Sequence, residues 1–156
     1  YLSENHDRQR ALDIVRASSS LPYVSKIVEV DGIPMLDGGI ADSIPVQHAI
    51  DMGWQHNVVV LTRNKGWRDM GKDHKIPYLY KNYPRLRVAL SHRHRAYNEQ
   101  IQLVDDLEAA GKITCIRPIR PLEVGRIEKD TDKLERLYEE GFMLGEAFCE
   151  KCVEKE

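Results

Sequence analysis

Apolar residues near the start of the chain recur three or four positions apart, the spacing of an amphipathic helix. Ser3 or Asn5 is suited to cap this helix, which we expect to end at the serine run of residues 18–20. The run lacks the flanking glycines of a nucleophile elbow, so it is interpreted as a helix-to-loop junction that satisfies backbone groups. The apolar positions are Ala11, Leu12, Ile14 and Val15.

The same spacing predicts two helices in the middle of the chain. A short helix follows Pro45 and ends at Gly53, in keeping with proline at helix starts and glycine just past helix ends. A long helix covers residues 85–110, preceded by Pro84 and followed by Gly111. Its basic segment, residues 91–95, is interpreted as a solvated face.

A last helix begins at Asp130 or Thr131. It contains a G-x-x-x-G sequence, Gly141 to Gly145, which predicts a kink or close packing. Its apolar positions are Leu134, Leu137, Tyr138, Leu144 and Phe148.

Strands are expected between these helices. Residues 26–30 and 33–36 are β-branched and apolar, and the intervening Asp-Gly predicts a hairpin with a type I′ turn. Residues 58–62 form an unbroken apolar run, typical of a parallel strand buried on both faces. Residues 113–119 form a further strand. The polar loop of residues 63–75 is expected to be solvated, with contact to an acidic head group as the minority interpretation.

Composition limits the class of protein. The chain has 156 residues, 42% hydrophobic and 31% charged, with a net charge of −2. These values fit one globular domain, or part of one, over residues 1–156 and do not favour nucleic acid as a partner. Three cysteines argue against a disulfide scaffold and favour a reducing, cytoplasmic location. We interpret Cys149 and Cys152 as ordinary helix thiols and expect no cofactor.

The stretch I-P-M-L-D-G-G-I-A-D-S-I-P, residues 33–45, carries the candidate chemistry. An acid, Asp37, ends a predicted strand, and Gly38 and Gly39 follow it. Asp37 and Asp42 allow four interpretations. They can cap a turn and a helix, bind a metal, flank an anion held by the glycine N–H groups, or supply Asp37 as a general base. The metal and anion interpretations lack supporting partners in the sequence.

The order of motifs resembles the later part of the patatin-like phospholipase domain, in its bacterial form. The motifs are R-A-S-S-S-L-P at residues 16–22, the Asp-Gly turn, L-D-G-G-I-A-D-S-I-P-V at residues 36–46, and V-V-V-L-T-R at residues 58–63. The resemblance is specific from residue 11 to residue 63 and looser beyond. It implies a three-layer α/β/α sandwich with a mainly parallel sheet, followed here by a helical C-terminal extension.

The resemblance also implies a serine–aspartate dyad that hydrolyses lipid esters, with Asp37 as its aspartate and Gly38 and Gly39 as its motif glycines. The family's serine lies in a G-x-S-x-G elbow, and a glycine-rich loop forms the oxyanion hole. This chain contains neither motif, so we expect both upstream of Tyr1. The chain alone should be inactive. An alternative is a non-catalytic α/β module that binds lipid or protein.

The resemblance has consequences for partners. The expected substrate is a lipid or acyl ester, which implies peripheral contact with membranes. A sheet that lacks its upstream strands should expose apolar residues such as those at 58–61. We therefore expect an oligomer or an upstream segment to cover them.

Overall fold

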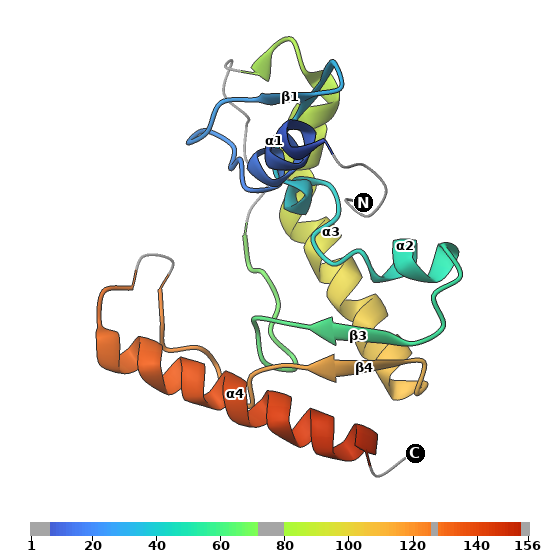
Figure 1. Cartoon of the computed structure of the whole chain (residues 1–156), viewed down its shortest axis with the longest axis vertical. Coiled ribbons are helices and arrows are strands. Elements are labelled where there is room, and N and C mark those ends of the chain that lie inside the picture. The colour runs from blue at the N-terminus through green and yellow to red at the C-terminus, as the bar shows by residue number, and fades with distance from the viewer. Residues whose placement is uncertain (1–6, 72–79, 126–127, 154–156) are drawn as a thin grey trace. The chain divides into compact units, whose positions relative to one another are not determined.

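The computed structural model describes residues 7–71, 80–125 and 128–153. These residues form four α-helices, one short 3-10 helix and two two-stranded sheets (Figure 1). They divide into two compact units. One comprises the described residues of Tyr1–Ile44 and Gly71–Tyr97, and the other those of Pro45–Met70 and Asn98–Glu156. The elements in chain order are α1 (Arg8–Ser18), β1 (Val28–Val30), β2 (Ile33–Met35), η1 (Gly38–Ile40), α2 (Val46–Asp51), β3 (Asn57–Val60), α3 (Pro84–Ala109), β4 (Ile113–Ile116) and α4 (Thr131–Val153).

Helix α1 forms where the apolar spacing predicts it, but its cap differs. The side chain of Asp7 accepts hydrogen bonds from the backbone N–H groups of Gln9 and Arg10, so the prediction of Ser3 or Asn5 as the cap was wrong. An aspartate there satisfies two of the N–H groups that a helix start leaves unpaired. The helix ends at Ser18, within the predicted serine run.

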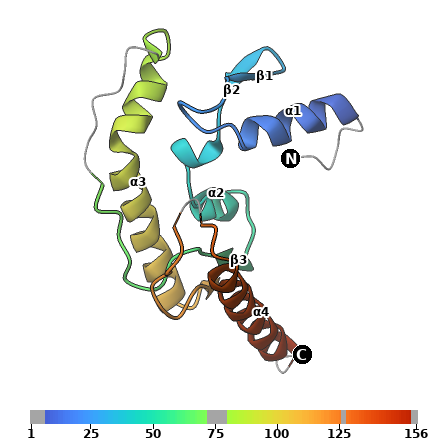
Figure 2. The same ribbon diagram turned by 90° about the vertical axis from the view of Figure 1, so that its left-hand side faces the viewer.

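The β1–β2 hairpin confirms the predicted turn. Val28 pairs with Met35 and Val30 with Ile33 in antiparallel register. Both turn residues have positive φ, 52° at Asp31 and 75° at Gly32, as a type I′ turn requires. Val28 and Val30 are buried together with Ala17 of α1, and Figure 2 shows the hairpin beside that helix. The hydrophobic effect on this shared apolar face therefore holds the hairpin against α1.

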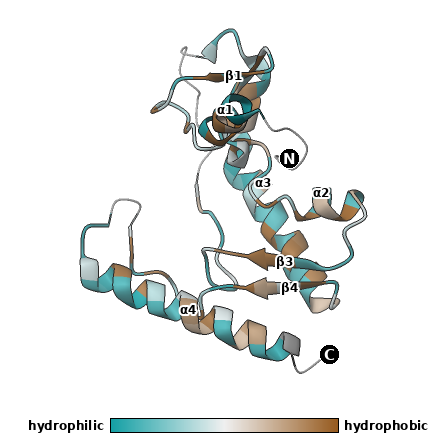
Figure 3. Ribbon diagram, in the orientation of Figure 1, coloured by the Kyte–Doolittle hydropathy of each residue, from teal (hydrophilic) through white to brown (hydrophobic). Residues whose placement is uncertain are grey.

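Strands β3 and β4 form the parallel pair of the other unit. Asn57 lies opposite Ile113 and Val60 opposite Ile116. The chain passes through α3 between the two strands, the kind of crossover that parallel strands need. Figure 3 shows that both strands are mostly hydrophobic. A mixed α/β fold with parallel pairing is thus confirmed, but the described residues do not show a complete three-layer sandwich.

The burial of β3 differs from the prediction. The pattern of residues 58–62 predicted burial on both faces, yet Val58 is 50% exposed and Val60 70% exposed. The separate expectation of exposed apolar residues at 58–61 is confirmed for these two valines. Val59 is half-buried and Leu61 is buried, so one face of β3 is covered and the other is largely open. An apolar run therefore indicates which faces are suited to burial, while the neighbouring elements decide which faces are buried.

The two long helices have the predicted boundaries. Helix α3 begins at Pro84 and is followed by Gly111 at φ +67°, the left-handed conformation of a helix stop. Helix α4 is capped by Asp130, whose carboxylate accepts from the N–H groups of Asp132 and Lys133. A kink or close packing was predicted at Gly141 and Gly145. Close packing was wrong, because a Cβ added at either position would meet no atom within 4 Å, and the kink stays a prediction.

Candidate active site

Asp37 lies in the turn between β2 and the 3-10 helix η1. Its side chain is half-buried, and its Oδ1 accepts a hydrogen bond of 2.7 Å from the backbone N–H of Gly39. The predicted capping role is therefore confirmed for Asp37, which is the N-cap of η1. It was wrong for Asp42, because α2 has Pro45 as its N-cap and no side-chain capping bond.

The two glycines after Asp37 have different surroundings. A Cβ at Gly39 would lie 3.0 Å from Asp37 Oδ1 and 3.9 Å from Ser43 Oγ, whereas a Cβ at Gly38 would meet nothing within 4 Å. Only Gly39 brings the backbone close beneath the acid. The steric need for glycine in this motif therefore rests on Gly39.

The turn is attached to the end of α1 by a backbone bond. The N–H of Asp37 donates to the carbonyl of Ser20 at 2.9 Å. Ser20 is buried, and its hydroxyl donates to the carbonyl of Arg16 at 2.7 Å. Ser19 makes the same kind of bond to Val15 and Arg16. These serines serve backbone groups, as predicted, and the last of them positions the acid-bearing turn.

Two side chains hold Gly39 from its carbonyl side. The Ser43 hydroxyl donates to the Gly39 carbonyl at 2.7 Å, and Arg93 Nε donates to the same oxygen at 3.0 Å. Arg93 lies in the basic segment that was interpreted only as a solvated face, and it is indeed exposed. Its contact with the Asp37–Gly39 turn was not predicted. Residues 39 and 93 are 54 positions apart, so no local spacing rule connects them.

The second carboxylate oxygen of Asp37 is open. Within the part of the chain that the structure describes, the Gly39 N–H is the one donor to this carboxylate. Oδ1 is therefore committed to the turn, and Oδ2 can accept a hydrogen bond from a hydroxyl group. This arrangement fixes the orientation of the acid and leaves one carboxylate oxygen without a donor among the described residues.

The basic loop at residues 63–75 is mostly occupied with internal contacts. Lys65 Nζ lies 3.0 Å from Glu108 Oε2, and Arg68 Nη2 lies 3.1 Å from Asp105 Oδ2. Arg63 stacks over the Trp67 ring at 4.9 Å from its centroid. Lys72 lies outside the described residues. These contacts favour a structural role for the loop cations over the binding of an acidic head group.

Arg117 completes that network from the end of β4. Its guanidinium is 9% exposed and contacts Asp105 and Glu108 of α3, each at 2.8 Å. Burial alone would raise the pKa of Asp105, but hydrogen bonds from Arg117 and Arg68 outweigh it and hold that pKa below its usual value. The carboxylate is therefore stabilised in its charged form, as a structural ion pair requires.

Neither metal nor thiol chemistry gains support. Among the described residues, no three or more histidine, cysteine or acidic side chains gather to hold a metal ion. Cys149 is exposed and unbonded in α4, while the side chain of Cys152 lies outside the described residues. Burial raises the pKa of the Cys115 thiol, which makes it a poor nucleophile at neutral pH. In the described residues, no helix combines the length and apolar character needed to cross a bilayer.

Comparison with known proteins confirms the resemblance for the first third of the chain. Residues 2–50 match the family model "Patatin-like phospholipase". Residues 83–154 match a second family model, "Domain of unknown function (DUF6363)". Asp37, Gly38 and Gly39 lie in the first match, and Arg93 lies in the second. The contact between Arg93 and Gly39 therefore joins segments that belong to two different family models.

A curated relative of similar sequence is the "Uncharacterized protein YjjU" of Escherichia coli (strain K12). It is 28% identical over 151 residues, which cover 90% of this chain and 41% of the relative. The chain thus spans less than half the length of this relative. No solved structure matches the chain.

Proposed function

We propose that this chain is part of a patatin-like serine acyl hydrolase acting on lipid esters, with Asp37 as the base of a serine–aspartate dyad. The observation that carries the proposal is the state of the Asp37 carboxylate. One oxygen is held by the Gly39 N–H at 2.7 Å, and the other has no donor among the described residues. The family match over residues 2–50 gives this acid its chemical context.

The proposed reaction needs groups that this chain does not contain. A serine from the rest of the protein attacks the ester carbonyl and gives its hydroxyl proton to Asp37 Oδ2. The protonated Asp37 then returns that proton to the departing alcohol as the acyl-enzyme forms. In the second step, Asp37 takes a proton from the water that attacks the acyl carbonyl. The bond to the serine oxygen then breaks, Asp37 returns the proton to that oxygen, and the carboxylic acid leaves. Backbone N–H donors outside this chain hold the developing oxyanion.

Asp37→Asn in the full-length protein is the sharpest test. The asparagine oxygen can still accept from the Gly39 N–H, so the turn keeps its cap while the base is lost. We expect hydrolysis of a short acyl ester to fall by about 10³-fold or more, with unchanged thermal unfolding. The matched control is Asp42→Asn, which changes an exposed acid five residues away and should keep activity. Near-normal turnover by the Asp37→Asn variant would remove the dyad assignment.

The alternative function is a non-catalytic α/β module that binds lipid or protein. It is favoured by one observation: the Asp37–Gly39 bond is a complete capping interaction that needs no further role. Under this alternative, Asp37→Asn leaves every property of the full-length protein unchanged. A G-x-S-x-G elbow and a glycine-rich loop in the remaining sequence of the parent protein would support the enzyme, and their absence would support the module.

The proposal extends to the surroundings of the chain. We propose that an upstream segment or a second subunit covers the open face of β3 around Val58, because that side chain is half exposed. We propose a cytoplasmic protein that reaches its substrate by peripheral contact with a lipid surface, and the low cysteine count supports this location. The 156-residue chain by itself should show no ester hydrolysis.

A further inference from the structure

An aliphatic cavity of about 310 Å³ lies between the β3–β4 pair and α4. It is found at the carboxyl ends of both strands, where Val60 and Ile116 lie opposite one another. Leu137 and Leu144 of α4 line it from the other side. Although Arg117 also lines the cavity, its guanidinium is engaged with Asp105 and Glu108. The cavity is therefore suited to an apolar group.

Gly141 explains why α4 leaves this space open. It lines the cavity, and a Cβ placed on it would meet no atom within 4 Å. Helices that pack on a sheet normally fill the interface with side chains. Here one of the α4 positions that line the cavity is a glycine without a side chain, so the helix leaves part of the space unfilled.

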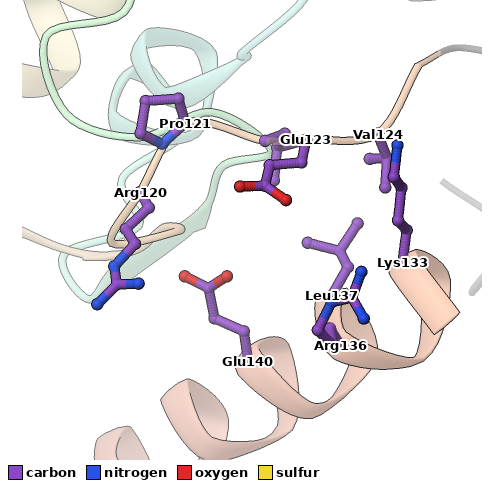
Figure 4. A pocket seen from close by; sticks show the side chains of 9 residues that line it. Arg120, Pro121, Glu123, Val124, Lys133, Arg136, Leu137 and Glu140 are labelled. Atoms are coloured by element: carbon purple, nitrogen blue, oxygen red, sulfur yellow. The ribbon is translucent and has the colours of Figure 1, made fainter.

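A second cavity, of about 190 Å³, adjoins the first and shares Leu122, Leu137 and Glu140 with it. Its remaining lining is strongly charged. In Figure 4 the carboxylates of Glu123 and Glu140 both point into the open space, Glu123 from the segment after β4 and Glu140 from α4. The cations that line it are Arg120, Lys133 and Arg136.

These charges are available for a ligand. Arg120 and Arg136 have no ion-pair partner among the residues that the structure describes. Glu140 uses one oxygen to accept from the N–H of Ile119 at 2.9 Å, which fixes its carboxylate in place. A purely anionic head group would meet two carboxylates in this cavity, and a cationic one would meet three cations. A head group with both charges complements both sets.

We propose that the two cavities together bind a single-chain amphiphile with a zwitterionic head, of the lysophospholipid class. The aliphatic cavity takes the chain. Arg120, Arg136 and Lys133 bind the phosphate of the ligand. Glu123 and Glu140 bind its quaternary ammonium group. This site uses none of the residues of the Asp37 turn, so it does not depend on the proposed hydrolase activity.

The test is calorimetric titration of the full-length protein with n-dodecylphosphocholine below its micelle concentration. This probe has no carboxylic ester, so a hydrolase cannot consume it. Three comparison ligands change one feature each. Dodecanoate has an anionic head group and dodecyl maltoside an uncharged one, whereas phosphocholine has the zwitterionic head group without the alkyl chain. We expect n-dodecylphosphocholine to bind most tightly of the four. Equal or tighter binding of dodecanoate or dodecyl maltoside would overturn the assignment of a zwitterionic head.

Gly141→Leu tests the chain site without endangering the fold. Leucine fills the open space, and it has a higher helix propensity than glycine. We expect n-dodecylphosphocholine binding to weaken at least about tenfold, equivalent to 1.4 kcal/mol. The matched control is Gly145→Leu, one turn further along α4, which does not line the cavity and should bind normally. Equal binding by both variants would overturn the chain site.

Glu140→Gln tests the head site. Glutamine keeps the acceptor for the Ile119 N–H and removes only the charge. We expect weaker binding of n-dodecylphosphocholine and stronger binding of dodecanoate. A parallel loss for both ligands would contradict the role of the carboxylate. Asp37→Asn should leave all of these affinities unchanged, so this proposal and the hydrolase proposal fail independently. If the rest of the parent protein fills the cavity, no probe binds and the proposal is overturned.

Discussion

The β1–β2 hairpin closes over a two-residue turn, whereas β3 and β4 pair only after the chain has passed through α3. The hairpin is held by its turn conformation and by apolar contact with α1. The parallel pair is instead tied to α3 by the buried Arg117 network, and one of its faces stays open. A local pair can thus be stabilised by neighbours in sequence, while a distant pair depends on specific long-range bonds.

The largest expected loss of stability is at Arg117, which ties the β3–β4 pair to α3. Arg117→Met removes the guanidinium that neutralises two partly buried carboxylates, which should lower the free energy of unfolding by about 3 kcal/mol. Urea unfolding followed by circular dichroism measures this. Lys65→Met is the matched control, because it removes the 67%-exposed cation of the same network and should cost under about 1 kcal/mol. Similar losses for both variants would mean that burial does not decide the strength of the network.

A smaller effect is expected at the turn that follows the hairpin. Gly39→Ala places a methyl group 3.0 Å from Asp37 Oδ1, which should destabilise the protein by about 1–2 kcal/mol. Gly38→Ala meets only open space and should be neutral. Thermal unfolding of the two variants compares adjacent positions in the same motif. If they proved equally stable, the tight approach of Gly39 to Asp37 would not be the reason for glycine there.

The smallest expected effect on stability is that of Arg93, which contacts the turn after the hairpin, as Arg117 contacts α3 beside the parallel pair. Arg93→Met removes one exposed hydrogen bond to the Gly39 carbonyl, which should cost at most about 1 kcal/mol. Its effect on ester hydrolysis by the full-length protein should exceed its effect on stability, because Gly39 orients Asp37. A loss of stability as large as that of Arg117→Met would break the contrast between the two regions.

The sequence predicted the features that depend on neighbouring residues. The Asp-Gly turn, the stop at Gly111 and the serine bonds at the end of α1 all follow from local backbone preferences. Asp37 was named as the candidate base from its place between a strand and two glycines, and that role stays a prediction. Asp7 was not predicted as the N-cap of α1, because several polar residues near the start of the chain have side chains that can cap a helix.

Long-range contacts could not be predicted in the same way. Val58 and Val60 have the residue types of a buried strand, but their burial depends on elements elsewhere in space. Arg93 carries no local sign that it contacts Gly39. Gly141 was interpreted as a position of a kink or of close packing, since a sequence motif cannot distinguish a filled interface from an empty one.

The bond from the Asp37 amide to the Ser20 carbonyl offers a direct record of local opening. A hydrogen-bonded amide proton exchanges with deuterium only when its bond breaks. The exchange rate of the Asp37 amide therefore measures how often the turn that carries this acid separates from the end of α1. Substrates that bind at Asp37 should slow that rate, and ligands that bind elsewhere on the chain should leave it unchanged.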